Sequence, residues 1–298
     1  MKKINKTILA ALMSLLILGL NSCEDDPPAT YQPKTFVEAI LIVDEPIRNL
    51  KLQASQRVGD VIDYGAAMIR DAEITIYEGD QVFPISVSQD VTDESGYYYE
   101  DQTYLVKPGT EYRIEITLSD GTFISGKTTT PNRTEWVIPA DDVIQFPKDT
   151  VNYVLDDSVN TDIEWTKVEG VKNFLLSVKC LDTEEYGIYN DDIPDSEMNR
   201  KRVGEKYNEE EDGWKYYETS FWGYIPLNKF QIIWRPFKWF GQHELAIFAP
   251  DPNFLKWFYQ SSWAGNYESV LTTIDGAAGV FGSASAVRDT FFLLKNQP

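Results

Sequence analysis

Three kinds of side chain in this 298-residue chain could do chemistry: one histidine, two cysteines and 47 aspartates and glutamates. A Ser–His–Asp triad and a histidine-rich metal site both need histidine as base or ligand. A single histidine, His243 in a strand-like run, nearly excludes both. We interpret His243 as a packed or edge residue of a strand.

The carboxylates carry no clear catalytic pattern. A glycosidase needs two acids facing each other across a cleft, but among so many acids pairs arise by chance. Residues 190–197 cluster Asn190, Asp191, Asp192, Asp195 and Glu197, oxygen ligands of the kind that Ca²⁺ prefers. The EF-hand spacing and its central glycine are missing, so a solvated acidic loop is the alternative. We therefore expect no enzymatic activity, no metal site and no cofactor.

The first cysteine, Cys23, follows a secretory signal. Residues 1–22 combine a lysine-containing head with an apolar run, Ile8–Leu20, which is too short for a transmembrane helix. Leu20-Asn21-Ser22-Cys23 fits the bacterial lipobox. We predict that Cys23 becomes the lipid-carrying N-terminus, because several acyl chains together anchor a protein stably. The alternative is an ordinary signal peptide followed by a cysteine.

The second cysteine and the net charge limit what the mature chain can do. Cys180 then has no intrachain partner for a disulfide, and its strand-like surroundings predict a buried residue. The net charge of −20 excludes nucleic acid as a partner and disfavours anionic lipid surfaces. Lipid, not charge, must therefore hold the protein to a membrane, with the acidic, proline-rich residues 23–34 as a tether.

Alternating apolar residues predict a mainly all-β chain with two β-sandwich domains, residues 35–130 and 135–298. In residues 112–128 Tyr112, Ile114, Ile116 and Leu118 alternate with polar residues, and Asp120-Gly121 supplies a two-residue hairpin turn. The second domain carries an acidic and aromatic insertion at about 182–240, and residues 253–263 have the spacing of a short helix.

The aromatic part of the insertion is the main candidate for ligand or partner contact. Exposed tryptophans are frequent hot spots of binding sites. The alternative is that these rings pack the insertion onto the sandwich. The candidate contact residues are Trp214, Trp222, Trp234, Trp239 and Trp257.

Near the C-terminus Gly276, Gly279 and Gly282 repeat at every third residue. This is not the dinucleotide-binding fingerprint, since no strand–turn–helix with a downstream acid accompanies it. The glycines indicate a tight irregular turn or close backbone packing.

Two segments resemble known β-sandwich modules. Residues 72–76, 92–97 and 106–112 together resemble carboxypeptidase-regulatory-like and other transthyretin-like modules, which are usually structural or binding units. Residues 161–180, with Trp165 early in the core pattern, resemble the first strands of a fibronectin type III domain.

The lipobox, the two β domains and the segment Thr273–Gly282 together resemble an uncharacterised, domain-of-unknown-function family of Bacteroidota outer-membrane lipoproteins. Thr273 and Ala277 depart from the C-terminal motif of that family. Its genes lie beside those of TonB-dependent receptors, so the resemblance implies a non-catalytic accessory of nutrient uptake. It implies no particular ligand.

The resemblance also gives Glu24, Asp25 and Asp26 a role, because acids after the lipidated cysteine resemble a surface-export signal of that phylum. The alternative is that they only solvate the tether. We expect a lipid-anchored protein facing the cell exterior, with the outer membrane, a TonB-dependent receptor and a glycan or peptide ligand as partners. The rival function is a free-standing glycan-binding or adhesive surface protein.

Overall fold

The computed structural model describes residues 31–57, 64–88, 96–145, 162–181, 220–232, 237, 241–263 and 272–294. The described chain is mainly β, as predicted. Its two helices are α2 (Tyr64–Ala67) and α5 (Pro252–Trp263). Its strands are β1 (Thr35–Ile42), β2 (Lys51–Ala54), β3 (Glu73–Glu78), β4 (Gln81–Val87), β5 (Tyr97–Tyr99), β6 (Glu111–Thr117), β7 (Phe123–Thr129), β8 (Trp136–Ile138), β9 (Val143–Gln145), β10 (Asp162–Trp165), β11 (Phe174–Cys180), β12 (Ser220–Ile225), β13 (Lys229–Gln231), β14 (Gly241–Pro250), β15 (Ile274–Asp275) and β16 (Ala278–Leu294).

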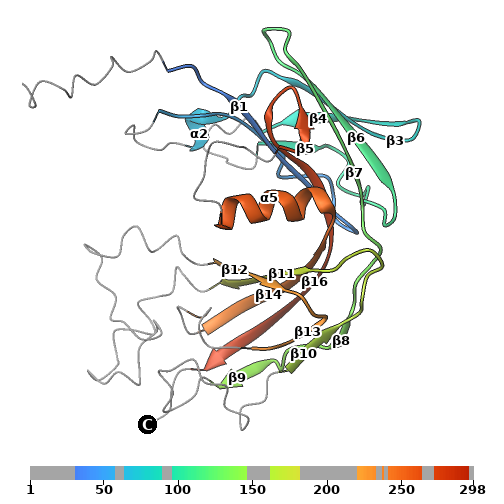
Figure 1. Cartoon of the computed structure of the whole chain (residues 1–298), viewed down its shortest axis with the longest axis vertical. Coiled ribbons are helices and arrows are strands. Elements are labelled where there is room, and N and C mark those ends of the chain that lie inside the picture. Colours follow the sequence, from blue (N-terminus) through green and yellow to red (C-terminus); the bar gives the residue numbers. More distant parts are fainter. Residues whose placement is uncertain are drawn as a thin grey trace, which may run out of the picture.

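The strands form three sheets. The largest has the order β12-β11-β14-β16-β1-β2, with β9 also paired to β16. The second has the order β15-β7-β6-β3-β4-β5, and the third is β13-β10-β8. The long strand β16, red in Figure 1, pairs first with β1 and then with β14, and so extends from the N-terminal to the C-terminal part of the molecule. Helix α5 lies beside it.

Two cores lie between these sheets. The N-terminal core joins β1 and β2 to the six-stranded sheet and includes Val37, Ile76, Tyr112 and Phe281. The C-terminal core joins β11, β14 and the end of β16 to the three-stranded sheet. Trp165 is fully buried in it, which confirms the predicted inward position of this tryptophan.

Strand β16 contributes to both cores. Its first half pairs in parallel with β1, from Phe36↔Ala278 to Ile42↔Ala284, and its second half pairs antiparallel with β14. The glycines of this segment had indicated a tight irregular turn or close backbone packing, and the structure makes most of it one long strand. The division into domains 35–130 and 135–298 stays a prediction, but a residue of the second range, Phe281, completes the core of the first.

A third cluster covers the other face of the large sheet. Helix α5 places Phe258 against Leu175, Ala246 and Phe248. This helix confirms the one predicted at 253–263. Because α5 covers the outer face of β11, this strand is buried on both faces apart from Lys179, although apolar and polar side chains alternate along its second half.

The hairpin of residues 112–128 is confirmed, with one correction. Strands β6 and β7 pair with Thr117 opposite Phe123, and the Leu118 N–H donates to the Thr122 carbonyl at 2.9 Å. The loop is therefore three residues, 119–121, and not two. Gly121 has a positive φ of 85°, which a three-residue hairpin loop needs at its last position.

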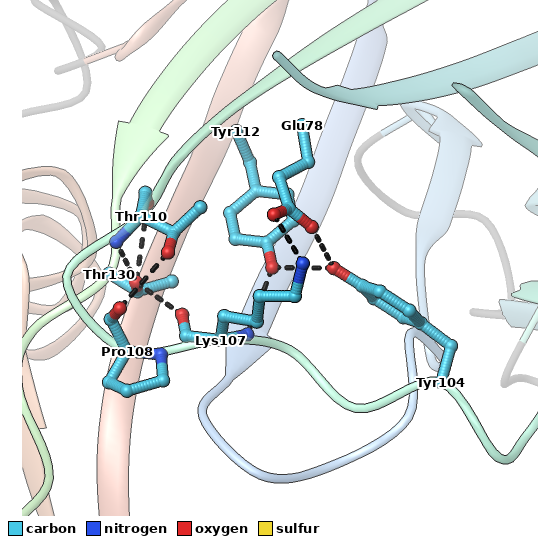
Figure 2. A network of polar contacts seen from close by, with 7 residues as sticks. All are labelled: Glu78, Tyr104, Lys107, Pro108, Thr110, Tyr112 and Thr130. Carbon is cyan, nitrogen blue, oxygen red and sulfur yellow. Dashed lines mark hydrogen bonds and ion pairs between the residues drawn. The ribbon is translucent and has the colours of Figure 1, made fainter. Parts of the chain in front are cut away.

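Beside this hairpin, Figure 2 shows a polar network that locks the N-terminal sandwich. The buried Tyr112 hydroxyl accepts from the Lys107 N–H at 2.9 Å and lies 2.7 Å from the Tyr104 hydroxyl. Tyr104 donates to Glu78 at 2.5 Å, and the Lys107 ammonium donates to the same carboxylate at 2.6 Å. This arrangement resembles the tyrosine corner of β-sandwiches, in which a tyrosine hydroxyl fixes backbone a few residues upstream.

The charges of this network support one another. Burial raises the pKa of Tyr112, so the phenol stays protonated. Burial would also raise the pKa of Glu78, but hydrogen bonds from Lys107 and Tyr104 outweigh it and hold that pKa below its ordinary value. Every polar group in the network has a partner within it, so we interpret it as structural.

Candidate functional site

The main candidate site is a cavity of about 680 Å³ on the outer face of the large sheet, the face that α5 covers. Four parts of the chain surround it: β1, residues 43–50 after β1, β12 and α5. We call it the α5 cleft. Its lining residues are Glu38, Ile40, Ile42, Glu45, Pro46, Arg48, Asn49, Lys51, Trp222, Phe248, Phe254, Trp257, Phe258 and Arg288.

The strand alternation explains which residues of β1 reach this cleft. Successive side chains of a strand point to opposite faces. In β1, Val37, Ala39 and Leu41 are buried in the N-terminal core. Glu38, Ile40 and Ile42 therefore point the other way, into the α5 cleft.

An aromatic stack forms one wall of the cleft. The Trp222 ring lies 5.2 Å from the Phe248 ring at an interplanar angle of 28°, a stacked arrangement, and 6.0 Å from the ring of Phe258. Phe248 and Phe258 are buried, whereas Trp222 is 42% exposed. Trp222 thus offers a flat apolar surface whose orientation is fixed from behind.

Ion pairs form the rim. The Glu45 carboxylate accepts from Arg288 at 2.8 Å and from Arg48 at 3.3 Å. The Arg288 guanidinium also lies over the Phe248 ring, 5.0 Å from its centre. On β2, the Lys51 ammonium lies 3.8 Å from Glu38. The rim is therefore charged, and its side chains are held in place by one another.

Asp251 positions the helix that forms the other wall. Its carboxylate accepts from the Phe254 N–H at 2.8 Å, which is an N-cap, and Pro252 follows as the first helical residue. The same buried carboxylate accepts from the Ser283 N–H at 3.1 Å and from the Thr128 hydroxyl at 2.7 Å. One side chain thus fixes α5 to both β16 and β7.

Gly282 lets the helix approach the sheet. A Cβ built on this residue would lie 2.9 Å from the Phe254 backbone nitrogen. At Gly276 and Gly279 a Cβ would lie 2.3 Å from the Phe123 carbonyl oxygen and 1.9 Å from the Val37 carbonyl oxygen. The prediction of close backbone packing is confirmed, although most of this segment is strand.

Two of the five candidate tryptophans, Trp222 and Trp257, line the α5 cleft together. The others, Trp214, Trp234 and Trp239, lie outside the described residues, as do Cys23, Glu24, Asp25 and Asp26 and the acidic cluster 190–197. Strands β12 and β13 fall within the predicted insertion of 182–240 but belong to the sheets. The bounds 182–240 of the insertion stay a prediction, but its last part contributes strands to the sheets.

The remaining reactive side chains are structural. His243 is buried, its Nδ1 lies 2.8 Å from the Gly241 carbonyl oxygen, and its ring stacks on Phe291 with centres 5.6 Å apart. Cys180 is buried and forms no disulfide. Both predictions of packed residues are confirmed. In the described part of the chain, no three His, Cys, Asp or Glu side chains form a group that could hold a metal ion.

The charged rim was missed from the sequence. Arg288 and Glu45 are 243 positions apart and meet only because β1 pairs with β16. Neither residue lies in a motif, so no local signal could have found them.

The fold is that of a mainly β, sandwich-type protein, and its cleft carries a stacked, partly exposed aromatic group. Residues 23–221 match the family described as Domain of unknown function (DUF4249), and the chain belongs to this family. No curated protein matches the chain. None of the helices among the described residues has the length and apolarity to cross a membrane.

Solved structures give only a distant likeness. A two-domain fibronectin type III segment of chicken tenascin matches at 10% identity, covering 88% of this chain and 99% of that one, with a TM-score of 0.20. Alpha-2-macroglobulin from Salmonella matches at 11% identity, covering 92% of this chain and 15% of that one, with a TM-score of 0.22. TM-scores this low do not establish a shared fold. The fold is defined by the strand pairing and the two cores.

Proposed function

We propose that this protein is a non-catalytic docking component at the bacterial cell surface, which works with a TonB-dependent receptor through the α5 cleft. The observation that carries the proposal is the half-exposed Trp222 ring, supported from behind by Phe248 and Phe258. A preorganised aromatic surface loses little conformational entropy when a partner covers it. Tryptophan and arginine are also the residues most enriched in binding hot spots.

The composition of the cleft supports binding over catalysis. None of the lining residues that the structure describes is histidine, cysteine, serine or threonine. Both of its carboxylates, Glu38 and Glu45, face cations at short distance. These groups are placed to recognise a charged partner, and no nucleophile with an adjacent base accompanies them.

The membrane location rests on the sequence pattern around Cys23. The last residues of the predicted tether already belong to the described body, because the Tyr31 hydroxyl and the Lys34 N–H lie 2.6 and 2.8 Å from the Ser55 hydroxyl oxygen. A lipid at Cys23 would hold this body near the bilayer. Glu24, Asp25 and Asp26 would direct it to the outer face.

We expect Cys23→Ser to abolish lipid attachment, because serine has no thiol to accept the diacylglyceryl group. The variant should lose metabolic labelling by palmitate and leave the membrane fraction. Cys180→Ser is the matched control and should still be labelled, since Cys180 lies inside the fold. A Cys23→Ser protein that keeps both its label and its membrane location would contradict the lipoprotein assignment.

The docking function is tested by co-purification from detergent-solubilised membranes. The wild-type protein should bring down a TonB-dependent receptor, and Trp222→Ala should lower the recovered receptor at least about tenfold, as for a hot-spot residue. Phe123→Ala is the control, because Phe123 is also an exposed aromatic residue (56%) but lies outside the cleft. Equal recovery with both variants would exclude the cleft as the docking site. If no receptor co-purifies with the wild type, the rival glycan-binding or adhesive function replaces this proposal.

A further inference from the structure

We propose that the α5 cleft takes a short polypeptide segment of the partner in which an apolar side chain stands between carboxylates. This inference rests on the proposed docking function and adds the chemistry of the bound group. The apolar floor of the cleft, its positive charge and the exposed donors of Arg48 support it.

The floor of the cleft is apolar and not only aromatic. Ile40 and Ile42 of β1 line it together with Phe254 and Phe258 of α5. A leucine, phenylalanine or tyrosine side chain inserted here would gain about 25 cal/mol for each Å² of apolar surface removed from water. A volume of about 680 Å³ is within the usual range of ligand cavities.

The same floor disfavours a sugar. A sugar ring carries hydroxyls around its whole edge, and a buried hydroxyl without a partner costs about 1–3 kcal/mol. The charged groups of the cleft lie at its rim and not in its floor, as in the pairs Glu45–Arg288 and Glu38–Lys51. A peptide avoids the cost of buried polar groups without partners, because only its apolar side chain enters the floor. Its backbone stays at the rim in contact with water.

The cleft also has a surplus of positive charge. Among the described lining residues, three cations, Arg48, Lys51 and Arg288, accompany two carboxylates, Glu38 and Glu45, although the whole chain carries −20. A positive patch on an acidic protein concentrates the potential that an acidic ligand meets on approach. Carboxylates are therefore the complementary groups for this rim.

Arg48 provides the free donors. In its pair with Glu45 it uses Nη2, at 3.3 Å, and its side chain is 52% exposed. A guanidinium has five N–H donors in a planar fork, so the other donors of Arg48 point to solvent or ligand. A bidentate contact to a carboxylate is the strongest interaction such a fork makes.

The test uses the purified full-length chain in detergent and three fluorescein-labelled pentapeptides, Gly-Glu-Phe-Glu-Gly, Gly-Lys-Phe-Lys-Gly and Gly-Glu-Gly-Glu-Gly, with cellotetraose as the carbohydrate probe. Fluorescence anisotropy should show that the first peptide binds at least about tenfold more tightly than the other two. Its affinity should fall with added salt. Cellotetraose should not compete.

Two variants of equal charge change locate the site. Arg48→Glu should lower the affinity for Gly-Glu-Phe-Glu-Gly at least about tenfold. Lys127→Glu, at an exposed lysine of β7 that does not line the cleft, should leave it within about twofold, since salt screens a solvent-exposed charge that makes no direct contact with the peptide.

Three outcomes would overturn the inference: equal binding of the glutamate and lysine peptides, equal effects of the two variants, or displacement of the labelled peptide by cellotetraose. These results differ from failure of the docking function. If the peptides do not bind but receptor recovery still depends on Trp222, the docking function stands and only the peptide chemistry is wrong.

Discussion

A Gly279→Ala variant should lose more than about 4 kcal/mol of unfolding free energy, which is exceptional for a single substitution. Gly279 has φ +128°, and an added Cβ would lie 1.9 Å from the carbonyl oxygen and 2.7 Å from the nitrogen of Val37. These are backbone atoms of β1, the parallel partner of this segment, so neither can rotate aside. Urea denaturation followed by far-UV circular dichroism measures the loss.

Gly121→Ala separates this close contact from backbone strain. Gly121 also has a positive φ, +85°, but nothing lies within 4 Å of the position of its Cβ. Only the cost of a left-handed conformation remains, about 1–3 kcal/mol. If the two variants lose the same stability, the approach of β1 to β16 is not what requires glycine at 279.

Gly279 also shows where prediction from the sequence stopped. Alternation in residues 112–118 identified β6 and the faces of its side chains correctly, because the period of a strand is a local property. The choice of the neighbouring strand with which a strand pairs is not a local property of its sequence. The pairing of residues 36–42 with 278–284 has no signal in either segment.

The composition of β16 concealed its secondary structure as well. Residues 278–286 are mostly alanine, glycine and serine, which have low strand propensity and indicate a turn. The structure requires small residues there because a helix approaches at Gly282 and another strand at Gly279. Packing on both sides overrode local propensity.

The candidate site was predictable only in part, for the same reason. The density of tryptophans indicated Trp222 and Trp257, and both line one cleft, while their role in binding stays a prediction. The three cations of the rim come from β2, from the segment before it and from β16. Their convergence depends on the β1–β16 pairing, so it could not be inferred before the topology was known.

The second large effect is expected at Asp251, on which the position of α5 depends. Asp251→Ala should cost about 3–5 kcal/mol, since it removes a helix cap and leaves buried donors without an acceptor. Those donors are the N–H groups of Phe254 and Ser283, at 2.8 and 3.1 Å, and the Thr128 hydroxyl at 2.7 Å. Thermal and urea unfolding of the full-length chain measure the loss.

Asp251→Asn is the matched variant and adds a pH test. Its amide oxygen can still accept from both N–H groups, and its amide nitrogen can donate to Thr128, so we expect a loss of only about 1 kcal/mol.

In the wild type, burial raises the pKa of Asp251 above its ordinary value of 3.8, although hydrogen bonds from the Phe254 and Ser283 N–H groups oppose the shift. A raised pKa in the folded state means that the protonated form stabilises the fold. This contribution is complete below pH 3.8 and disappears as the pH rises through the folded-state pKa. The stability of the wild type relative to Asp251→Asn should therefore be higher at pH 4 than at pH 7, and the comparison cancels the titration of the other acids. A difference that stays constant between the two pH values, or that grows toward pH 7, would mean that the hydrogen bonds outweigh burial and that the carboxylate is favoured in its charged form.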